Sequence, residues 1–281
     1  RMGLGPSSSH TMGPRFAAQA FKAAAAGASR IRVTLYGSLA ATGRGHLTDL
    51  AVSEPFSPLP VELIWEAEQL LPRHTNGMQF EAFGEAGSPV AKRVMYSVGG
   101  GALLDEEGNP DGGIDVYPYT CMQEILDKTE RDGLLIWELV QQCEGSVLSP
   151  YLEGIWAAMQ RAIKRGLNAE GKLPGTLNVP RKASAYHARS QNMAGYFGQT
   201  ALLFAYALAV SEENAAGGEI VTAPTCGACG VLPAVLFFLQ QQSSLTNEKI
   251  CRALATAGLI GNLIKRNASI SGAEVGCQGE V

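Results

Sequence analysis

The stretch Asp105-Glu-Glu-Gly-Asn-Pro-Asp-Gly-Gly-Ile-Asp-Val-Tyr-Pro-Tyr119 divides this chain of 281 residues into two parts with different patterns. It is rich in acidic residues, glycine, asparagine and proline, which is typical of a loop or linker. The length also favours two domains, because a single domain usually has about 100–150 residues. The sequence therefore predicts a first domain over residues 1–119, which includes the linker at 105–119, and a second domain over residues 120–281.

Helical and strand patterns alternate before the linker. Residues 14–26 are rich in alanine and are followed by Gly27, as expected of a helix. Residues 31–36 alternate apolar with polar or smaller side chains, which is typical of a half-buried strand. The other elements that we expect are a helix at 61–71 and strands at 78–83 and 90–98. This order of elements predicts a mixed α/β domain.

Beyond the linker the pattern is helical almost throughout. Its longest apolar runs are shorter than the roughly 20 residues that a membrane-spanning helix needs, so we expect buried core helices and no membrane partner. The expected helices lie at 122–130, 134–143, 150–165 (closed by Gly166), 200–212, 231–242 and 247–266, the last of them capped by Thr246 or Asn247. The predicted fold class is therefore α+β, with a mixed α/β N-terminal domain followed by an all-α domain.

Charge and cysteine content narrow the classes of function. The net charge is −4, and acidic and basic residues are interspersed, so we expect no nucleic-acid partner and a small-molecule substrate instead. The six cysteines are scattered through a long chain and do not resemble a disulfide framework. No signal peptide opens the sequence, which favours a reducing, cytoplasmic location.

Two polar, glycine-rich segments lie in the first domain. Gly3-Leu-Gly-Pro-Ser-Ser-Ser-His-Thr11 precedes a helix, whose free N–H groups together with serine hydroxyls can bind a carboxylate. Ordinary helix capping is the alternative, but it needs only one such residue. The second segment, 36–49, places His46 in a glycine-rich turn after a strand. Histidine exchanges protons near neutral pH, so His46 is a candidate base, although a single loop histidine is often a solvated surface residue.

Two further segments of this kind lie in the second domain. Cys226-Gly-Ala-Cys229 has the spacing of a redox pair or of half a zinc site. Neither reading is well supported, because the first belongs near a βαβ unit and the second needs another pair of ligands. Residues 267–281 place Cys277 between glycines, which suits a metal or cluster close to the main chain. A small buried cysteine is the alternative.

Taken together, these motifs resemble the bacterial iron–sulfur L-serine dehydratases over nearly the whole chain. The matching strings are G-x-G-P-S-S-S-H-T-M-G-P, Y-G-S-L-A-x-T-G-x-G-H-x-T-D, Y-S-V-G-G-G, V-P-R-K-A, E-E-N-A-A-G-G, T-A-P-T-C-G-A-C-G-V-L-P-A-V-L and N-A-S-I-S-G-A-E-V-G-C-Q-G-E-V. The resemblance implies a 4Fe-4S lyase, without pyridoxal phosphate, that converts L-serine to pyruvate and ammonia in serine degradation and gluconeogenesis. It also implies an N-terminal domain similar to the allosteric substrate-binding domain of some phosphoglycerate dehydrogenases, and a helical domain that carries the cluster.

The resemblance also implies roles for individual residues. His46 is the expected base at Cα, and His10 is expected to orient or bind the substrate. Cys277 matches the first of three cluster cysteines, and we expect the other two beyond residue 281, because the second domain looks truncated. The expected substrate-binding residues are Ser7, Ser8, Ser9, Thr11, Ser97, Asn214, Asn267, Ser269 and Ser271.

The remaining cysteines and histidines match no cluster or catalytic motif. Cys226 stands where related sequences often carry asparagine, and we expect Cys226 and Cys229 to be pocket residues rather than cluster ligands. Three cysteines on expected helices, and two histidines outside the motifs, are expected to be packing, surface or structural residues. They are Cys121, Cys143, Cys251, His74 and His187.

Other functions remain open at this level. A pyridoxal-phosphate dehydratase would need a Schiff-base lysine beside a phosphate-binding loop, and no lysine lies in such a motif. A non-catalytic serine-sensing module is the second alternative. Serine and threonine differ by one methyl group, which discriminates by only about 1–3 kcal/mol and cannot be read from motifs. A homodimer is expected because two-fold oligomers are the commonest.

Overall fold

The computed structural model describes residues 1–110, 116–222, 224–267 and 277. These residues form two compact units. The α/β unit contains residues 6–110. The helical unit contains residues 1–5, 116–222, 224–267 and 277.

The α/β unit is built on a five-stranded mixed sheet with the strand order β3-β2-β4-β5-β6. Strand β2 (Arg30–Tyr36) pairs in parallel with β3 (Val61–Glu66) and antiparallel with β4 (Gly77–Phe83). Strands β5 (Pro89–Ser97) and β6 (Leu103–Asp105) extend the sheet in antiparallel pairs. The strands expected at 31–36, 78–83 and 90–98 are thus confirmed.

The helix expected at 61–71 is wrong. Residues 61–66 form the edge strand β3, which pairs along its whole length with β2, from Ile31 opposite Val61 to Tyr36 opposite Glu66. The sequence Val-Glu-Leu-Ile-Trp-Glu contains β-branched and aromatic residues, which fit a half-buried strand, and pairing with a neighbouring strand overrides a short apparent helical period.

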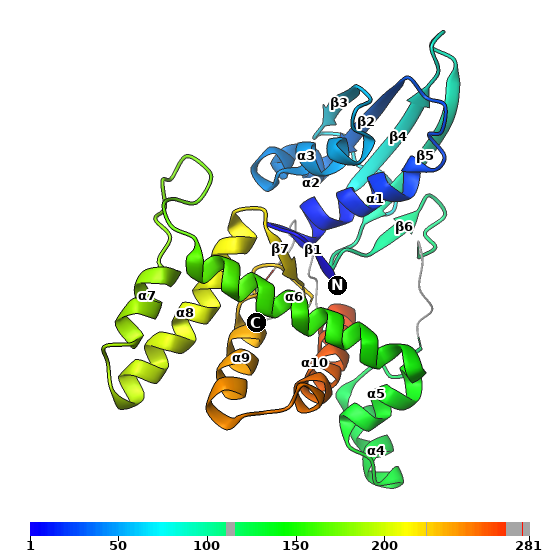
Figure 1. Cartoon of the computed structure of the whole chain (residues 1–281). Helices are drawn as coiled ribbons and strands as arrows, with labels where there is room; N and C mark the ends of the chain where they lie inside the picture. Colours follow the sequence, from blue (N-terminus) through cyan, green and yellow to red (C-terminus); the bar gives the residue numbers. More distant parts are fainter. Residues whose placement is uncertain (111–115, 223, 268–276, 278–281) are drawn as a thin grey trace. The chain divides into compact units, whose positions relative to one another are not determined.

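Two helices, α1 (Gly13–Lys22) and α2 (Gly37–Thr42), pack on this sheet, and α3 (Thr48–Ser53) packs against α1 (Figure 1). After α3 the chain makes one 3₁₀ turn, Glu54–Phe56, and reaches β3 within a few residues. This connection is short, so the segment that follows His46 is tied closely to the edge of the sheet.

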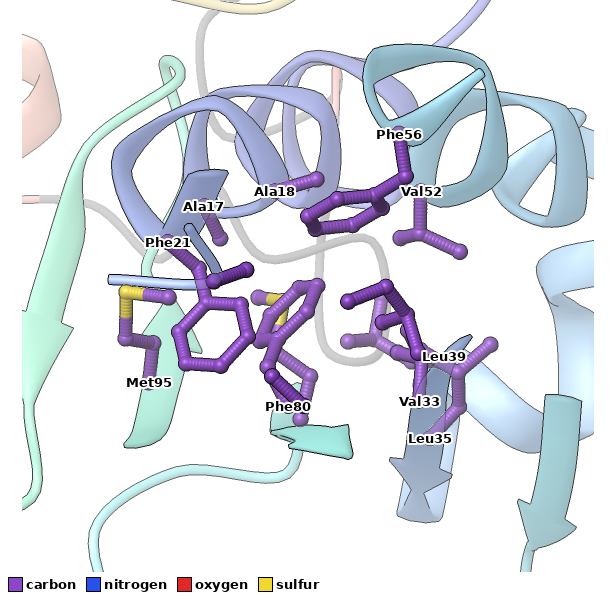
Figure 2. Close-up of a cluster of buried hydrophobic side chains, with 14 of the residues drawn as sticks. Ala17, Ala18, Phe21, Val33, Leu35, Leu39, Val52, Phe56, Phe80 and Met95 are labelled. Carbon is purple, nitrogen blue, oxygen red and sulfur yellow. The ribbon is translucent and has the colours of Figure 1, made fainter. Parts of the chain in front are cut away.

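The core of the α/β unit lies between α1 and the sheet. Figure 2 shows Phe21 of α1 directed toward Phe80 and Met95 of the strands. The ring centroids of Phe21 and Phe80 are 5.5 Å apart, and Phe56 adds a third ring 6.2 Å from Phe80. All three rings are almost fully buried, and each contributes on the order of 1.5–3 kcal/mol by leaving water. This core fixes the start of α1, where the first polar motif ends.

The helical unit contains seven helices among the described residues. They are α4 (Met122–Asp132), α5 (Ile136–Glu144), α6 (Leu148–Asn168), α7 (Ala183–Ser190), α8 (Gly195–Ala215), α9 (Val231–Ser243) and α10 (Asn247–Asn267). The expected helices are confirmed, with two differences: α6 continues through Gly166, and α7 lies in a segment where none was expected. At the start of α10, Thr246 Oγ1 accepts a hydrogen bond from the N–H of Lys249, as expected of a cap.

The long helix α6 packs against α8, α9 and α10 (Figure 1). It approaches α8 closely at Gly166, where an added Cβ would collide with the backbone of Ala209. A two-stranded antiparallel sheet completes the helical unit, formed by β1 (Met2–Leu4) and β7 (Glu219–Val221). The predicted fold class, α+β with a helical second part, is confirmed.

None of the helices in the described part of the chain is long and apolar enough to span a bilayer.

Candidate active site

The first polar motif forms a π-helical turn, Ser8–Met12, at the start of α1. Such turns are rare and are frequent at functional sites. The turn buries His10, which is 1 % exposed and lies between two hydroxyls: its Nδ1 is 2.8 Å from Ser9 Oγ, and its Nε2 is 3.0 Å from Ser38 Oγ. Burial, and next the neighbouring imidazole of His46, lower the pKa of His10 to about 4. His10 is therefore neutral at physiological pH.

His46 ends the 3₁₀ turn Gly43–His46 and is half-buried. The centroids of the His10 and His46 rings are 4.9 Å apart. The Nδ1 of His46 lies 3.0 Å from the carbonyl oxygen of Thr42, which can only accept a hydrogen bond. Nδ1 must therefore carry a proton, and in the neutral ring the lone pair is left on Nε2. This is the tautomer of an imidazole that is ready to accept a proton at Nε2.

The other hydroxyls of the first motif, and the hydroxyl of Ser97 that bonds to it, have two kinds of hydrogen-bonding role. Thr11 Oγ1 donates to the carbonyl oxygen of His46 (2.6 Å), and Ser97 Oγ donates to that of Ser9 (2.7 Å). Each hydroxyl has one proton, so these two cannot also donate to a substrate. Ser7 and Ser8 instead accept hydrogen bonds, from the N–H of His10 (3.1 Å) and of Gly100 (3.3 Å). Accepting a bond leaves each hydroxyl its own proton, which Ser8 can donate to a ligand and Ser7 can donate either to a ligand or to Ser9 Oγ, 3.5 Å away.

In the helical unit, the motif Glu212-Glu213-Asn214 lies at the end of α8 and is buried. Glu212 Oε1 accepts hydrogen bonds from the N–H groups of Lys182 (2.6 Å) and Ala183 (3.2 Å), and so caps α7. Glu213 forms ion pairs with Arg165 (2.9 Å) and Arg181 (3.2 Å). These contacts hold the two motifs 179–183 and 212–218 together.

Asn214 lies against the chain entering from β1. A Cβ added at Gly5 would collide with the backbone and side-chain oxygens of Asn214. Residue 5, the second glycine of the first motif, must therefore be a glycine. Asn214 is 9 % exposed. Its side-chain amide lies beside Gly5, near the start of that motif.

The cysteine segments also meet within the helical unit. The thiol of Cys277 lies against Gly227, where an added Cβ would collide with its sulfur and approach its Cβ to 3.0 Å. Cys277 is exposed, whereas Cys226 and Cys229 on either side of Gly227 are 2 % and 5 % exposed. Cys229 also lines an apolar pocket of about 500 Å³ between α9 and α10. The described residues include no cluster of three or more potential metal ligands, so Cys277 is the one predicted ligand that they supply.

Comparison with known proteins identifies the family. A family model described as serine dehydratase alpha chain matches residues 119–281, and one described as serine dehydratase beta chain matches residues 1–59 and 55–108. This chain belongs to the serine dehydratase family. The resemblance predicted from the motifs is thereby confirmed.

Serine dehydratases from several bacteria align with the whole chain. The L-serine dehydratase of Haemophilus influenzae and the L-serine dehydratase TdcG of Escherichia coli are each 38 % identical to it over 336 residues, which cover 100 % of this chain and 74 % of each relative. That of Streptomyces coelicolor is 38 % identical and is covered to 73 %. The aligned region is longer than the 281 residues of this chain, so the relatives carry extra residues inside it. The two beta-chain matches meet at 55–59, in the short connection between α3 and β3.

One further site residue predicted from the serine dehydratase motifs contacts main-chain oxygens of the helical unit, and two others lie outside the described residues. The side-chain amide of Asn267 donates to the carbonyl oxygens of Thr120 (3.1 Å) and Leu263 (2.9 Å) at the end of α10. Ser269 and Ser271 lie outside the described residues.

The cysteines and histidines outside the motifs were expected to be packing, surface or structural residues. Cys143 and Cys251 are half-buried on helices, but Cys121 is exposed and precedes α4, so the prediction that it packs in a helix is wrong. His74 Nδ1 accepts the N–H of Asn76, and His187 lies half-buried on α7.

Two residues of the histidine site were not predicted. Ser38 and Thr48 belong to the second polar motif of the serine dehydratase pattern, but only His46 of that motif was chosen. Ser38 contacts the His10 ring, and Thr48 Oγ1 donates to the carbonyl oxygen of His10 (2.5 Å). Within that motif, Ser38 lies eight residues before His46 and Thr48 lies two residues after it. This closeness to the candidate base in the sequence was the signal that could have identified both residues.

Proposed function

We propose that this chain catalyses the conversion of L-serine to pyruvate and ammonia, with His46 as the base at Cα and a 4Fe-4S cluster held in part by Cys277. Family membership and the relatives named L-serine dehydratase support the substrate and the reaction. The observation that carries the role of His46 is its hydrogen bond to the Thr42 carbonyl oxygen, which leaves the lone pair on Nε2.

The reaction poses two chemical problems. The hydroxide of serine is a poor leaving group, and its Cα–H is weakly acidic because the adjacent carboxylate is already negative. The cluster, when bound, would supply a Lewis-acidic iron that stabilises the departing hydroxide. The Cα proton must be taken by the protein.

His46 is suited to take this proton. Its Nε2 lone pair accepts the proton from Cα, and the resulting imidazolium is stabilised by the hydrogen bond from Nδ1–H to Thr42. His10 supports this step by being neutral, because a charged ring 4.9 Å away would repel the imidazolium. Loss of water gives aminoacrylate, whose imine tautomer hydrolyses to pyruvate and ammonia.

The substrate carboxylate needs donors, because negative charge accumulates beside it as the Cα proton leaves. Ser7 and Ser8 retain hydroxyl protons for this purpose, whereas those of Thr11 and Ser97 are donated to the main chain. Preorganised donors of this kind are commonly worth about 3–4 kcal/mol each. We therefore assign carboxylate binding to Ser7 and Ser8, and structural roles to Thr11 and Ser97.

The residues near Cys277 fit a cluster ligand. An exposed thiol lies directly on the Gly227 backbone, at a place where any side chain would collide with it. Glycine at such a place allows a bulky inorganic group to approach the main chain. Cys277 would hold one iron of the cluster.

The decisive experiment is a pair of histidine variants assayed for pyruvate formation from L-serine in anaerobically prepared protein. His46→Ala should lower kcat by at least about 10³-fold while the visible absorption of the cluster is unchanged. His187→Ala, which changes a half-buried histidine on α7, is the matched control and should retain near-normal activity.

Three results would overturn the proposal in different ways. Near-normal activity of His46→Ala would remove His46 as the base. A colourless, metal-free preparation with full activity would remove the cluster. Calorimetric serine binding without pyruvate formation would favour a serine-sensing module. The cytoplasmic location and the homodimer remain predictions.

A further inference from the structure

Two threonines connect the segments that carry His10 and His46. Thr11, which follows His10, donates its hydroxyl proton to the carbonyl oxygen of His46 (2.6 Å). Thr48, two residues after His46, donates its hydroxyl proton to the carbonyl oxygen of His10 (2.5 Å). The two hydrogen bonds are thus reciprocal: each histidine segment receives one from the other. We call Thr11 and Thr48 the threonine pair.

Both members of the threonine pair are buried, and each donates its hydroxyl proton to a main-chain oxygen. Thr48 is 0 % exposed and Thr11 is 3 % exposed. Around Thr48 the chain is tightly packed: a Cβ added at Gly43 would lie 3.0 Å from Thr48 Oγ1 and 3.0 Å from the ring of Trp65. A glycine at position 43 therefore lets the turn that carries His46 lie close to Thr48.

The backbone between His46 and Thr48 also needs support. Leu47 has a φ of 57°, in the left-handed region that non-glycine residues seldom adopt. Such a conformation is strained and persists only where the surroundings enforce it. The hydrogen bonds of the threonine pair flank Leu47 on both sides, through the His46 carbonyl oxygen and the Thr48 side chain.

We infer that Thr48 is a positioning residue for the reaction, which together with Thr11 fixes the His46 segment relative to the buried His10. This inference deepens the proposed function, since it rests on His46 as the base. Without the Thr48 hydrogen bond, the turn that carries His46 can relax at Leu47. The ring would then lose its alignment with the Thr42 carbonyl oxygen. A displacement of about 1 Å at a reacting group can cost on the order of 10²-fold in rate.

The test compares Thr48→Val, which keeps the shape and removes the hydroxyl, with Thr48→Ser, which keeps the hydroxyl. In anaerobically prepared protein, Thr48→Val should lower kcat about 10- to 100-fold with little change in KM, because Thr48 does not touch substrate. Thr48→Ser should recover most of the activity. A residue with a purely structural role would affect stability without this split between kcat and KM.

A second readout does not depend on catalysis. The ¹⁵N signals of histidine rings distinguish a proton on Nδ1 from one on Nε2, so they report directly on the His46–Thr42 hydrogen bond. Wild-type protein and Thr48→Ser should show the Nδ1–H form of His46, and Thr48→Val should show a mixture. If the wild-type ring already shows the mixture, the geometry is refuted. If the ring signals are as expected but His46→Ala is active, the proposed function fails instead.

Two further variants keep the inference testable if Thr48→Val does not fold. Thr11→Val removes the other bond of the threonine pair and should reproduce the loss of kcat and the mixture of tautomers. Gly43→Ala should do the same by displacing Thr48, whereas Gly45→Ala is the matched control, because a Cβ at Gly45 meets nothing within 4 Å. Wild-type kcat and ring signals in Thr48→Val, or in Thr11→Val and Gly43→Ala, would overturn the inference.

Discussion

The histidine site of the α/β unit and the cysteine segments of the helical unit are held in different ways. His10 and His46 are fixed by hydrogen bonds with nearby hydroxyls and with a carbonyl oxygen, all of which belong to the α/β unit. Cys277 is exposed, lies against a glycine, and has no group of further metal ligands around it in the described part of the chain. The two histidine rings are thus positioned by hydrogen bonds within the protein, whereas the cluster proposed at Cys277 would need further ligands.

This difference predicts that the two regions respond separately to mutation. Changes at the thiol should remove the cluster and leave the histidine network intact. Changes at His10 should alter the stability of the α/β unit and its dependence on pH.

Replacement of the thiol should have the largest effect. Cys277→Ala removes a cluster ligand and with it the stabilisation of the leaving hydroxide, so kcat should fall by at least about 10³-fold. The visible absorption of the cluster should be lost, while the histidine ring signals of the α/β unit stay as in the wild type. Cys121→Ala, which removes another exposed cysteine, is the control and should keep both colour and activity. Retained absorption in Cys277→Ala would show that the ligand assignment is wrong.

The free energy of unfolding should depend on pH through His10. The pKa of His10 is about 4 in the folded protein and 6.5 in an unperturbed histidine, so the unfolded chain binds this proton more readily. The contribution of neutral His10 to stability is complete above pH 6.5 and is lost as the pH falls from about 6.5 to 4. The full loss is about 3 kcal/mol.

This prediction is checked by urea unfolding between pH 4 and pH 8. His10→Gln should weaken the dependence of the unfolding free energy on pH over that interval, and His187→Gln on α7 should leave it unchanged. An identical pH dependence in wild type and His10→Gln would show that His10 is not buried in its neutral form. Since the effect arises in the α/β unit, loss of the cluster should not alter it.

The smallest effect is expected within the helical unit, at two glycines of α6. Gly166→Ala places a methyl group on the backbone of Ala209 and should destabilise the unit by about 1–3 kcal/mol. Gly154→Ala meets nothing within 4 Å and should stabilise the same helix by about 0.5–1 kcal/mol. Thermal unfolding of both variants tests the packing of α6 on α8. Equal stability of the two variants would contradict this packing.

Much of the fold could be predicted from sequence patterns, and the failures have physical causes. The alternation in β2 and the long apolar helices α8 and α9 reflect burial, which local patterns report well. Helix α7 was missed because its start is capped by Glu212, about 30 residues further along the chain. The strand β3 was missed because its pairing with β2, not its own period, determines its conformation.

The site was predictable to a similar degree. Motif composition pointed to His10, His46 and Cys277, since these residue types carry acid–base and metal chemistry. It could not assign a direction to each hydroxyl, and so Thr11 and Ser97 were expected to bind substrate although they donate to main-chain oxygens. Ser38 reaches His10 only because β2 and α2 bring residues 28 positions apart together.

Strand β1 has a consequence for attempts to divide the molecule. Residues 1–5 pair with β7 in the helical unit, through Arg1, Gly5 and their partners Thr222 and Gly218, and the chain then continues into the α/β unit. A single break at the linker would leave this strand covalently attached to the wrong fragment. The two fragments would complement each other by pairing β1, which stays on the α/β fragment, with β7 of the helical fragment. The helical fragment made alone would expose an unpaired edge at β7, which promotes association with other chains.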